Sequence, residues 1–274
     1  MEYGLRLLRA GKLPADPRDI CPLQWREDLP PGTLRALYFG TEFCEDLLPA
    51  TVEAESFCRL ARESKIEAVL MTPIATPRGL RRVDRLLAEL QRRGYAPTVS
   101  FNDWGILGLL RKSYPRLKRK AGRLINRSNR DPRLAHEAPP PSALTQDRGD
   151  RLRSLLLCLG VSGVETDPDL EGSYLKSEIS TLQRVLHLPY VFAATGRNCL
   201  IKAESMDAED SFSKGLGKSC PALCRERCLP VKRSDTRVPL WRAGNTLFYE
   251  VSEDWAAVHL SRCDRIVLHE RPMP

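Results

Sequence analysis

The chain has 274 residues, of which 42% are hydrophobic, and its formal net charge at pH 7 is +8. This hydrophobic content excludes a largely disordered chain and is enough for a substantial core, in one large α/β domain or two small ones. No apolar run approaches the about 18 residues that span a bilayer, and the N-terminal residues lack a secretory signal, so we expect a cytoplasmic protein whose nine cysteines are thiols or metal ligands.

Predicted strands and helices alternate after an N-terminal extension, residues 1–32, that ends in a Pro-Pro-Gly turn. Compact apolar runs predict buried strands at 34–40, 66–73, 96–101, 120–126, 161–167, 190–195, 246–251 and 264–270. Apolar residues at helical spacing predict helices at 52–64, 78–93, 105–115, 144–159 and 176–186, and a short helix before 264. Residues 127–142 contain four prolines and no periodicity, which indicates an excursion or lid.

This alternation favours a parallel α/β sheet, which forms either a barrel or an open, doubly wound sheet. Polar side chains follow successive strands, and in a barrel they converge on one face. These residues are Cys44, Asn102, Asp103, Asn126, Glu165, Asp167 and Cys199. We therefore predict a TIM-type (β/α) barrel, complete or incomplete, as a single domain over residues 33–274.

Positive charge is concentrated in residues 111–133, RKSYPRLKRKAGRLINRSNRDPR. Such a run is more often a solvated surface than a binding face, although basic segments also contact phosphate groups. RNA is therefore one candidate partner, and this segment is its only support in the sequence.

Four cysteines lie between residues 199 and 228, where Cys220, Cys224 and Cys228 form a C-x3-C-x3-C ladder and Cys199 stands alone. Structural zinc sites usually combine two close pairs of ligands, and here there is no second pair and no histidine nearby. An isolated thiolate with a tight group favours an iron–sulfur cluster, in which each thiolate binds a separate iron. Zinc and unligated thiols are the alternatives.

Other cysteines differ in their surroundings. Cys44 follows the strand predicted at 34–40 and is a fifth candidate ligand. Cys58 and Cys158 lie in apolar patterns typical of the core, and Cys263 is expected to be structural.

Several segments occur in an order that resembles one family. They are ALYFGTEFC (36–44), SFNDWGIL (100–107), AGRLINRSNRDPR (121–133), VSGVETD (161–167), LHLPYVFAATGRNC (186–199) and the terminal cysteine pair. The chain resembles the collagenase-like peptidase family U-32, and within it the small, cluster-bearing branch that includes the anaerobic ubiquinone-biosynthesis hydroxylation factors.

The resemblance implies a TIM-type barrel with a four-iron four-sulfur (4Fe-4S) cluster. Cys44 and Cys199 match the two isolated ligands, and a C-x3-C pair supplies the others. That pair is Cys220 with Cys224 or Cys224 with Cys228. The segment after Cys228 is similar to the one that follows the final ligand in relatives, which favours the second pair, although this chain has one extra cysteine and a longer loop after Cys199.

The resemblance also implies oxygen-independent hydroxylation of a quinone-type or other aromatic precursor. Alternatives are hydroxylation of a tRNA or ribosomal RNA base, a non-catalytic subunit that pairs with a second U-32-like chain, and a true peptidase. The sequence has no HExxH or G-x-S-x-G motif, which counts against the peptidase. Candidate substrate-pocket residues are Asn102, Asp103, Arg123, Asn126, Asp131, Arg133 and Glu165. Asp103 can instead cap a helix, and Asp131 can lie in a turn.

Overall fold

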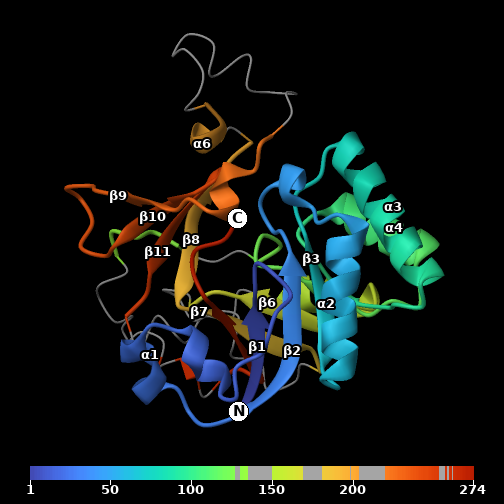
Figure 1. The fold of residues 1–274 in the computed structure, drawn as a ribbon, viewed down its shortest axis with the longest axis horizontal. Helices are drawn as coiled ribbons and strands as arrows, with labels where there is room; N and C mark the ends of the chain where they lie inside the picture. The colour runs from blue at the N-terminus through green and yellow to red at the C-terminus, as the bar shows by residue number, and fades with distance from the viewer. Residues whose placement is uncertain are drawn as a thin grey trace.

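The computed structural model describes residues 1–126, 130–134, 150–168, 181–197, 199–203, 220–252, 257, 259–260 and 262–274. Within these residues, eight parallel strands form a closed barrel in the order β1-β12-β7-β6-β5-β4-β3-β2 (Figure 1). The strands are β1 (Glu2–Arg6), β2 (Thr33–Gly40), β3 (Glu67–Thr72), β4 (Thr98–Phe101), β5 (Arg119–Ala121), β6 (Gly163–Thr166), β7 (Gln183–Leu188) and β12 (Arg265–His269). The prediction of a TIM-type barrel is confirmed.

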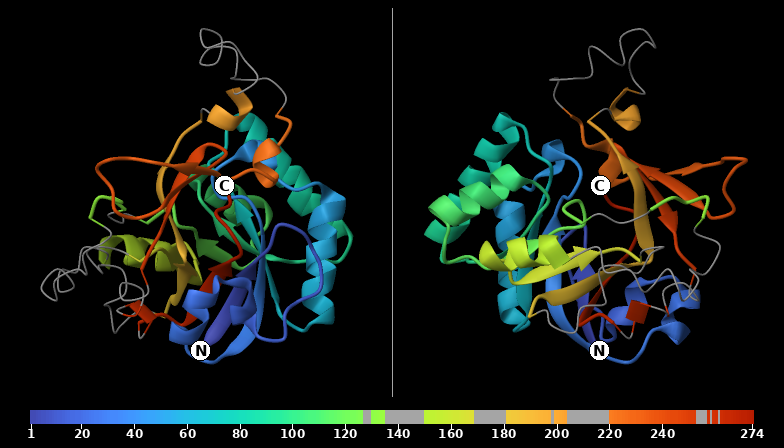
Figure 2. Two further views of the ribbon diagram at one scale, coloured as in Figure 1. Left: turned by 60° about the vertical axis from the view of Figure 1, so that its left-hand side comes forward. Right: turned by 180° about the vertical axis from the view of Figure 1, so that it is seen from behind.

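Helices cover the outside of the barrel, as the view from behind also shows (Figure 2). The longer ones are α2 (Thr51–Glu63), α3 (Pro77–Arg92), α4 (Trp104–Ser113) and α5 (Asp150–Cys158). Shorter elements are η1 (Pro17–Ile20), α1 (Leu23–Asp28), η2 (Glu45–Leu47), α6 (Leu200–Ala203) and η4 (Leu223–Arg225). No helix in the described ranges is both long enough and apolar enough to cross a membrane.

Side-chain alternation separates the two faces of each barrel strand. On β2, Leu37 and Phe39 belong to the main core between barrel and helices, where the ring of Phe39 stacks on that of Phe57 in α2 with centroids 5.0 Å apart. Ala36 and Tyr38 point the other way and form a separate buried cluster with residues of β3, β7 and β12. The strands therefore present one set of side chains to the helices and another to the barrel interior.

A second, four-stranded antiparallel sheet is inserted between β7 and β12. It contains β8 (Tyr190–Thr195), β9 (Leu229–Val231), β10 (Leu240–Ala243) and β11 (Thr246–Glu250), in the order β8-β11-β10-β9. It lies on the side of the barrel toward which the strand arrows point, the carboxyl side (Figure 1). The tight turn between β10 and β11 is Gly244-Asn245, and Gly244 has φ of +60°. Gly-Asn is a recognised hairpin signal, and the strands predicted at 190–195 and 246–251 belong to this sheet rather than to the barrel.

Two predicted segments need correction. Residues 2–6 do not belong to an N-terminal extension, because they form β1 and pair with both β2 and β12. The helix predicted at 176–186 is wrong at its carboxyl end, where residues 183–188 form β7. Residues 185–188 are all buried, so this strand has none of the alternation that distinguishes strand from helix in a sequence.

Other boundaries differ in length. The strand predicted at 120–126 ends at Ala121 in β5. Residues 127–129 and 135–149, which include most of the predicted excursion and the start of the helix predicted at 144–159, lie outside the described residues.

Candidate functional site

The first cysteine of the candidate metal centre lies directly after β2. Gly40 has φ of +97°, and a side chain at this position would collide with the carbonyl oxygen of Met71. Only glycine therefore fits here, and its backbone lets the chain turn out of the barrel. The hydroxyl of Thr41 accepts a hydrogen bond from the backbone N–H of Cys44 at 3.3 Å and lies 3.0 Å from the carbonyl oxygen of Pro274. These contacts hold Cys44 at the carboxyl end of the barrel.

Three cysteines meet in one small cluster beside this loop. Cys224 is buried and packs with half-buried Cys44 and Cys199, together with Leu47 and Ile201. The backbone N–H of Lys202 donates a hydrogen bond to Sγ of Cys199 at 3.4 Å. Segments far apart in the sequence, namely the loop after β2, the start of α6 and η4, therefore each contribute a cysteine to one cluster.

Cys220 belongs to the same neighbourhood, whereas Cys228 does not. A charge on Cys220 acts on the pKa of Cys44, Cys199 and Cys224 alike. Cys228 instead packs against the aromatic cluster of Phe43, Tyr190, Phe192 and Phe248. Burial raises the pKa of its thiol, and Arg271 opposes this rise. The structure thus packs Cys224 with Cys44 and Cys199 and places Cys228 against a different cluster. Whether Cys220 or Cys228 is the fourth ligand stays a prediction.

The chemistry of these thiols suits metal binding only if protons leave. Burial raises the pKa of Cys44 to about 11 and that of Cys224 to about 12. Both thiols are therefore neutral at pH 7 unless a cation replaces the proton. In the described part of the chain, no three His, Cys, Asp or Glu side chains are grouped to hold a metal ion. A four-iron cluster needs ligands that are spread more widely than those of a single metal ion, because each thiolate binds its own iron and the ligands surround the cluster.

The remaining cysteines are free thiols away from this group. Cys21, Cys58 and Cys263 are buried in the main core. Cys158 is exposed, which contradicts the expectation that it lies in the core. Its helix, α5, buries Leu156 and leaves Leu155 and Leu157 outside, a distinction that the continuous apolar run LLLCLG does not reveal.

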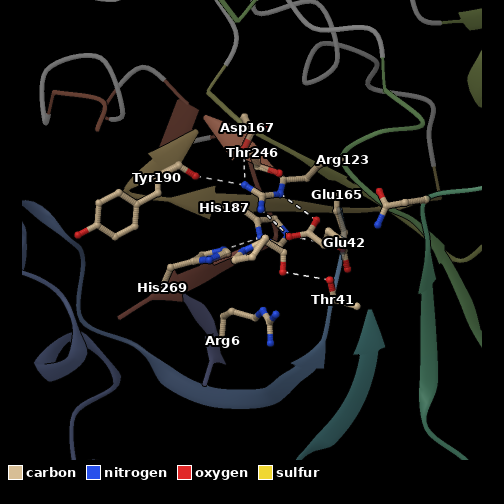
Figure 3. Close-up of polar contacts among 12 residues, drawn as sticks. Arg6, Thr41, Glu42, Arg123, Glu165, Asp167, His187, Tyr190, Thr246 and His269 are labelled. Atoms are coloured by element: carbon tan, nitrogen blue, oxygen red, sulfur yellow. Dashed lines mark hydrogen bonds and ion pairs between the residues drawn. The ribbon is translucent and has the colours of Figure 1, made fainter. Parts of the chain in front are cut away.

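A buried arginine organises the polar groups at the carboxyl side of the barrel. Arg123 is fully buried and donates to both carboxylate oxygens of Glu42, at 3.0 and 2.5 Å, and to Asp167 at 2.8 Å (Figure 3). It also donates to the carbonyl oxygen of Tyr190, the first residue of β8. Arg130 donates to the second oxygen of Asp167 at 2.8 Å. Burial alone raises the pKa of Glu42, but Arg123 reverses the shift, so Glu42 is ionised.

A second polar group lies inside the barrel around Glu165. Ser100 donates to Oε2 of Glu165 at 2.6 Å, and Nε2 of His187 lies 3.4 Å from the same oxygen. His187 Nδ1 is 2.8 Å from His269 Nε2, and Asn126 donates to the backbone carbonyl of Glu165. Burial, with Arg123, His187 and Arg6, lowers the pKa of His269 well below 6.5, so its ring is neutral.

Several polar atoms of this inner group have no partner among the described residues. They are Oε1 of Glu165, Oδ1 of Asn126 and Nε2 of His187. Leaving such atoms unsatisfied in a protein interior costs free energy, so they mark a place where water or a ligand group binds. Glu165 and Asn126 contribute acceptors, which suit a ligand group that donates a hydrogen bond.

The residues predicted to line a substrate pocket lie in different places in the structure. Arg123, Asn126 and Glu165 lie in the two buried polar groups. Asn102 connects the backbone of Thr72 and Leu124, and Asp103 caps α4 by accepting from the N–H groups of Gly105 and Ile106.

Arg133 is exposed and pairs with Asp131, whose carboxylate also accepts from the backbone N–H of Arg133 in a turn. Asp103 and Asp131 therefore have the local roles that the sequence offered as alternatives to substrate binding, and Arg133 pairs with Asp131.

Other site residues were missed by the sequence reasoning. Glu42 precedes Cys44 by two residues, and His187 and His269 occupy barrel strands. A signal for the histidines was available, since each is a polar residue inside an apolar strand pattern.

Comparisons with known proteins do not establish a family for this chain. No family model and no curated protein matches the chain. Among solved structures, the chain is similar to the U32 peptidase Mk0906, with 14% identity, coverage of 100% of this chain and 93% of that chain, and a TM-score of 0.41. It is also similar to a glycoside hydrolase family 18 N-acetylglucosaminidase from Paenibacillus barengoltzii, with 12% identity, coverage of 86% and 77%, and a TM-score of 0.26. Both TM-scores are low, and neither similarity establishes a family.

Proposed function

We propose that the chain is an iron–sulfur protein of the U-32 peptidase-like type that acts in oxygen-independent hydroxylation of a quinone-type or other aromatic precursor. The proposed ligands of a 4Fe-4S cluster are Cys44, Cys199, Cys220 and Cys224. The observation that carries this proposal is the packing of Cys44, Cys199 and Cys224, from separate segments, in one cluster at the carboxyl side of the barrel, where enzymes of this fold bind substrates. Cys220, four residues before Cys224, is proposed as the fourth ligand. When bound, such a cluster supplies one-electron transfer.

The inner polar group supports an aromatic substrate with a hydroxyl group. Oε1 of Glu165 and Oδ1 of Asn126 are free acceptors, and a phenolic hydroxyl can donate to them. In this proposal Glu165 accepts the hydroxyl proton on Oε1, leaving the electron pair on the substrate oxygen. Ser100 donates to the other carboxylate oxygen at 2.6 Å and holds that carboxylate in place.

The RNA alternative has less support in the structure than in the sequence. Of the basic segment 111–133, Lys120 faces the barrel interior and pairs with Glu67, and Arg123 is fully buried between two carboxylates. Arg130 binds Asp167, and Arg133 binds Asp131. Four basic residues of the described part of this segment are therefore paired with carboxylates of the protein itself, which leaves less positive charge for phosphate binding than the sequence suggests.

The metal proposal is tested on anaerobically purified full-length protein. We expect about four irons per chain and a broad thiolate-to-iron absorbance, and either Cys44→Ala or Cys199→Ala should remove the iron. The decisive pair is Cys220→Ala against Cys228→Ala. Iron should be lost in the first and retained in the second. Colourless protein with one zinc contradicts the cluster, and the reverse result for the pair assigns the ligand to Cys228.

The reaction is tested in a deletion strain grown without oxygen. We expect an under-hydroxylated quinone precursor to accumulate, and the wild-type gene, but not Cys199→Ala, to clear it. Glu165→Gln should also fail while its protein keeps iron, whereas exposed Glu63→Gln should restore the product. Normal quinones with a missing hydroxyl on an RNA base would instead favour the RNA reading.

The non-catalytic reading is tested separately by purification. If the chain acts only as a subunit beside a second U-32-like protein, the isolated iron-loaded chain should show no turnover, and activity should return when the partner is added. Turnover by the isolated chain would contradict an accessory role.

A further inference from the structure

Arg6 is a buried arginine at the carboxyl end of β1. The residue is 3% exposed, and its Nη2 donates to the carbonyl oxygen of Gly40 at 2.6 Å. Its Nη1 has a weak contact of 3.4 Å with the carbonyl oxygen of Leu7, and its Nε has no partner among the described residues. In Figure 3 its side chain stands apart from the Glu42–Arg123–Asp167 group, with no interaction drawn to it.

This guanidinium has no carboxylate of its own in the part of the chain that the structure describes. The acidic residues whose charges reach it are Glu42, Glu165 and Glu53. Each is engaged elsewhere: Glu42 by Arg123, Glu165 by Ser100 and Glu53 by Arg225. A buried charge without a counter-charge is costly, and arginine does not lose its proton at ordinary pH, so a negative charge nearby would stabilise it.

A small cavity lies between Arg6 and the cysteine group. It has a volume of about 30 Å³, and its lining includes Arg6, Gly40, Leu47, Cys224 and Pro274. A water molecule needs roughly 10–15 Å³ of such volume and at least two polar partners. The cavity therefore has room for one or two waters but is too small for a phosphate or an organic anion. The polar residues at its wall are Arg6, whose Nε–H is unpartnered, Cys224, and the mutually paired Glu53 and Arg225.

We propose that Arg6 is the buried counter-charge of the metal centre and donates a hydrogen bond, through water in this cavity, toward Sγ of Cys224. This inference rests on the proposed cluster, which with four thiolates carries a net negative charge. Because reduction adds another negative charge, a buried cation close to a ligand sulfur stabilises the reduced state. Hydrogen bonds toward the sulfurs act in the same direction, so Arg6 raises the reduction potential.

The test compares reduction potentials of full-length variants in anaerobic spectroelectrochemical titrations. Arg6→Gln removes the charge but keeps a donor for the carbonyl of Gly40, and we expect a more negative potential with iron content near that of the wild type. Arg6→Lys keeps the charge, so its potential should lie between those of wild type and Arg6→Gln. The matched control is Arg225→Met, which lines the same cavity but has a 41% exposed side chain paired with Glu53. Solvent screening should leave its potential close to wild type.

The outcomes are separable. Iron-loaded Arg6→Gln with an unchanged potential overturns the role of Arg6 and leaves the cluster in place. If the reduction potential shifts equally in Arg6→Gln and Arg225→Met, the role of Arg6 is also overturned, because removal of any nearby positive charge would then explain the shift. If Arg6→Gln does not fold, Arg6→Lys decides. We expect its potential to be lower than that of the wild type because the hydrogen bond toward Sγ of Cys224 is lost, and a potential at or above the wild-type value would overturn the role of Arg6. Wild-type protein without iron overturns the cluster and this inference together.

Discussion

Arg123 is the residue on which the polar architecture of the carboxyl side depends. Its replacement by methionine would leave Glu42 and Asp167 buried without their shared cation. Breaking a buried ion pair in this way costs about 3–5 kcal/mol, so we expect Arg123→Met to lower the free energy of unfolding by that order in urea denaturation at pH 7. The control is Arg133→Met, which removes an exposed pair with Asp131 and should change stability little. Equal losses would contradict the importance of burial.

Glu67 gives stability a defined pH dependence at the opposite end of the barrel. Burial raises the pKa of Glu67, but Lys120 and Arg265 more than offset this and lower it from 4.5 to about 2. A carboxyl with a lower pKa in the folded state contributes stability that is present above pH 4.5 and is lost as the pH falls toward 2. Denaturation curves measured across this range should therefore show a steeper acid loss in the wild type than in Glu67→Gln. Parallel curves would show that Glu67 does not contribute.

At the scale of elements, the β10–β11 hairpin supports the cysteine group. A Cβ at Gly244 would lie 3.3 Å from Sγ of Cys224, and the φ of +60° strains any other residue. We expect Gly244→Ala to cost about 1–3 kcal/mol and to lower iron retention, because Cys224 must shift. Gly94→Ala is the matched control, since its φ is +79° but no atom lies within 4 Å of an added Cβ. It should lose stability and keep its iron, and equal iron loss in both variants would contradict a role for the hairpin.

At the scale of the whole molecule, closure of the barrel depends on its first strand. β1 pairs with β2 on one side and β12 on the other, and it buries Tyr3 and Leu5. Burial of each such side chain contributes about 1.5–3 kcal/mol, and the exposed strand edges would add to the loss. Deletion of residues 1–6 should therefore abolish cooperative thermal unfolding monitored by circular dichroism. Serine substitutions at exposed Gly11 and Lys12 should leave it intact, and cooperative unfolding of the deletion variant would contradict this account.

Although closure of the barrel was established by the tertiary structure, the sequence by itself determined the repeated strand–helix pattern and the α/β class, favoured a barrel and marked the cysteines worth testing. This was possible because strands such as β2 and helices such as α3 have local signals: an apolar run ended by glycine, and a buried stripe of Val83, Leu86, Leu87 and Leu90 after a Thr76 cap. The resemblance matched Cys44 and Cys199, already candidate ligands in the sequence, to the two isolated ligands of the family, and these assignments remain predictions.

Only the tertiary structure decided which distant residues meet. Glu2 pairs with Arg265, and Cys44 packs with Cys224, across separations that no local pattern records. The sequence gives Cys220–Cys224 and Cys224–Cys228 the same C-x3-C spacing, and only the tertiary structure shows that Cys228 packs against aromatic rings, most of them from the second sheet. β7 has the same limitation, because a strand buried on both faces loses the periodicity that would identify it, and its pairing with β6 and β12 alone defines it.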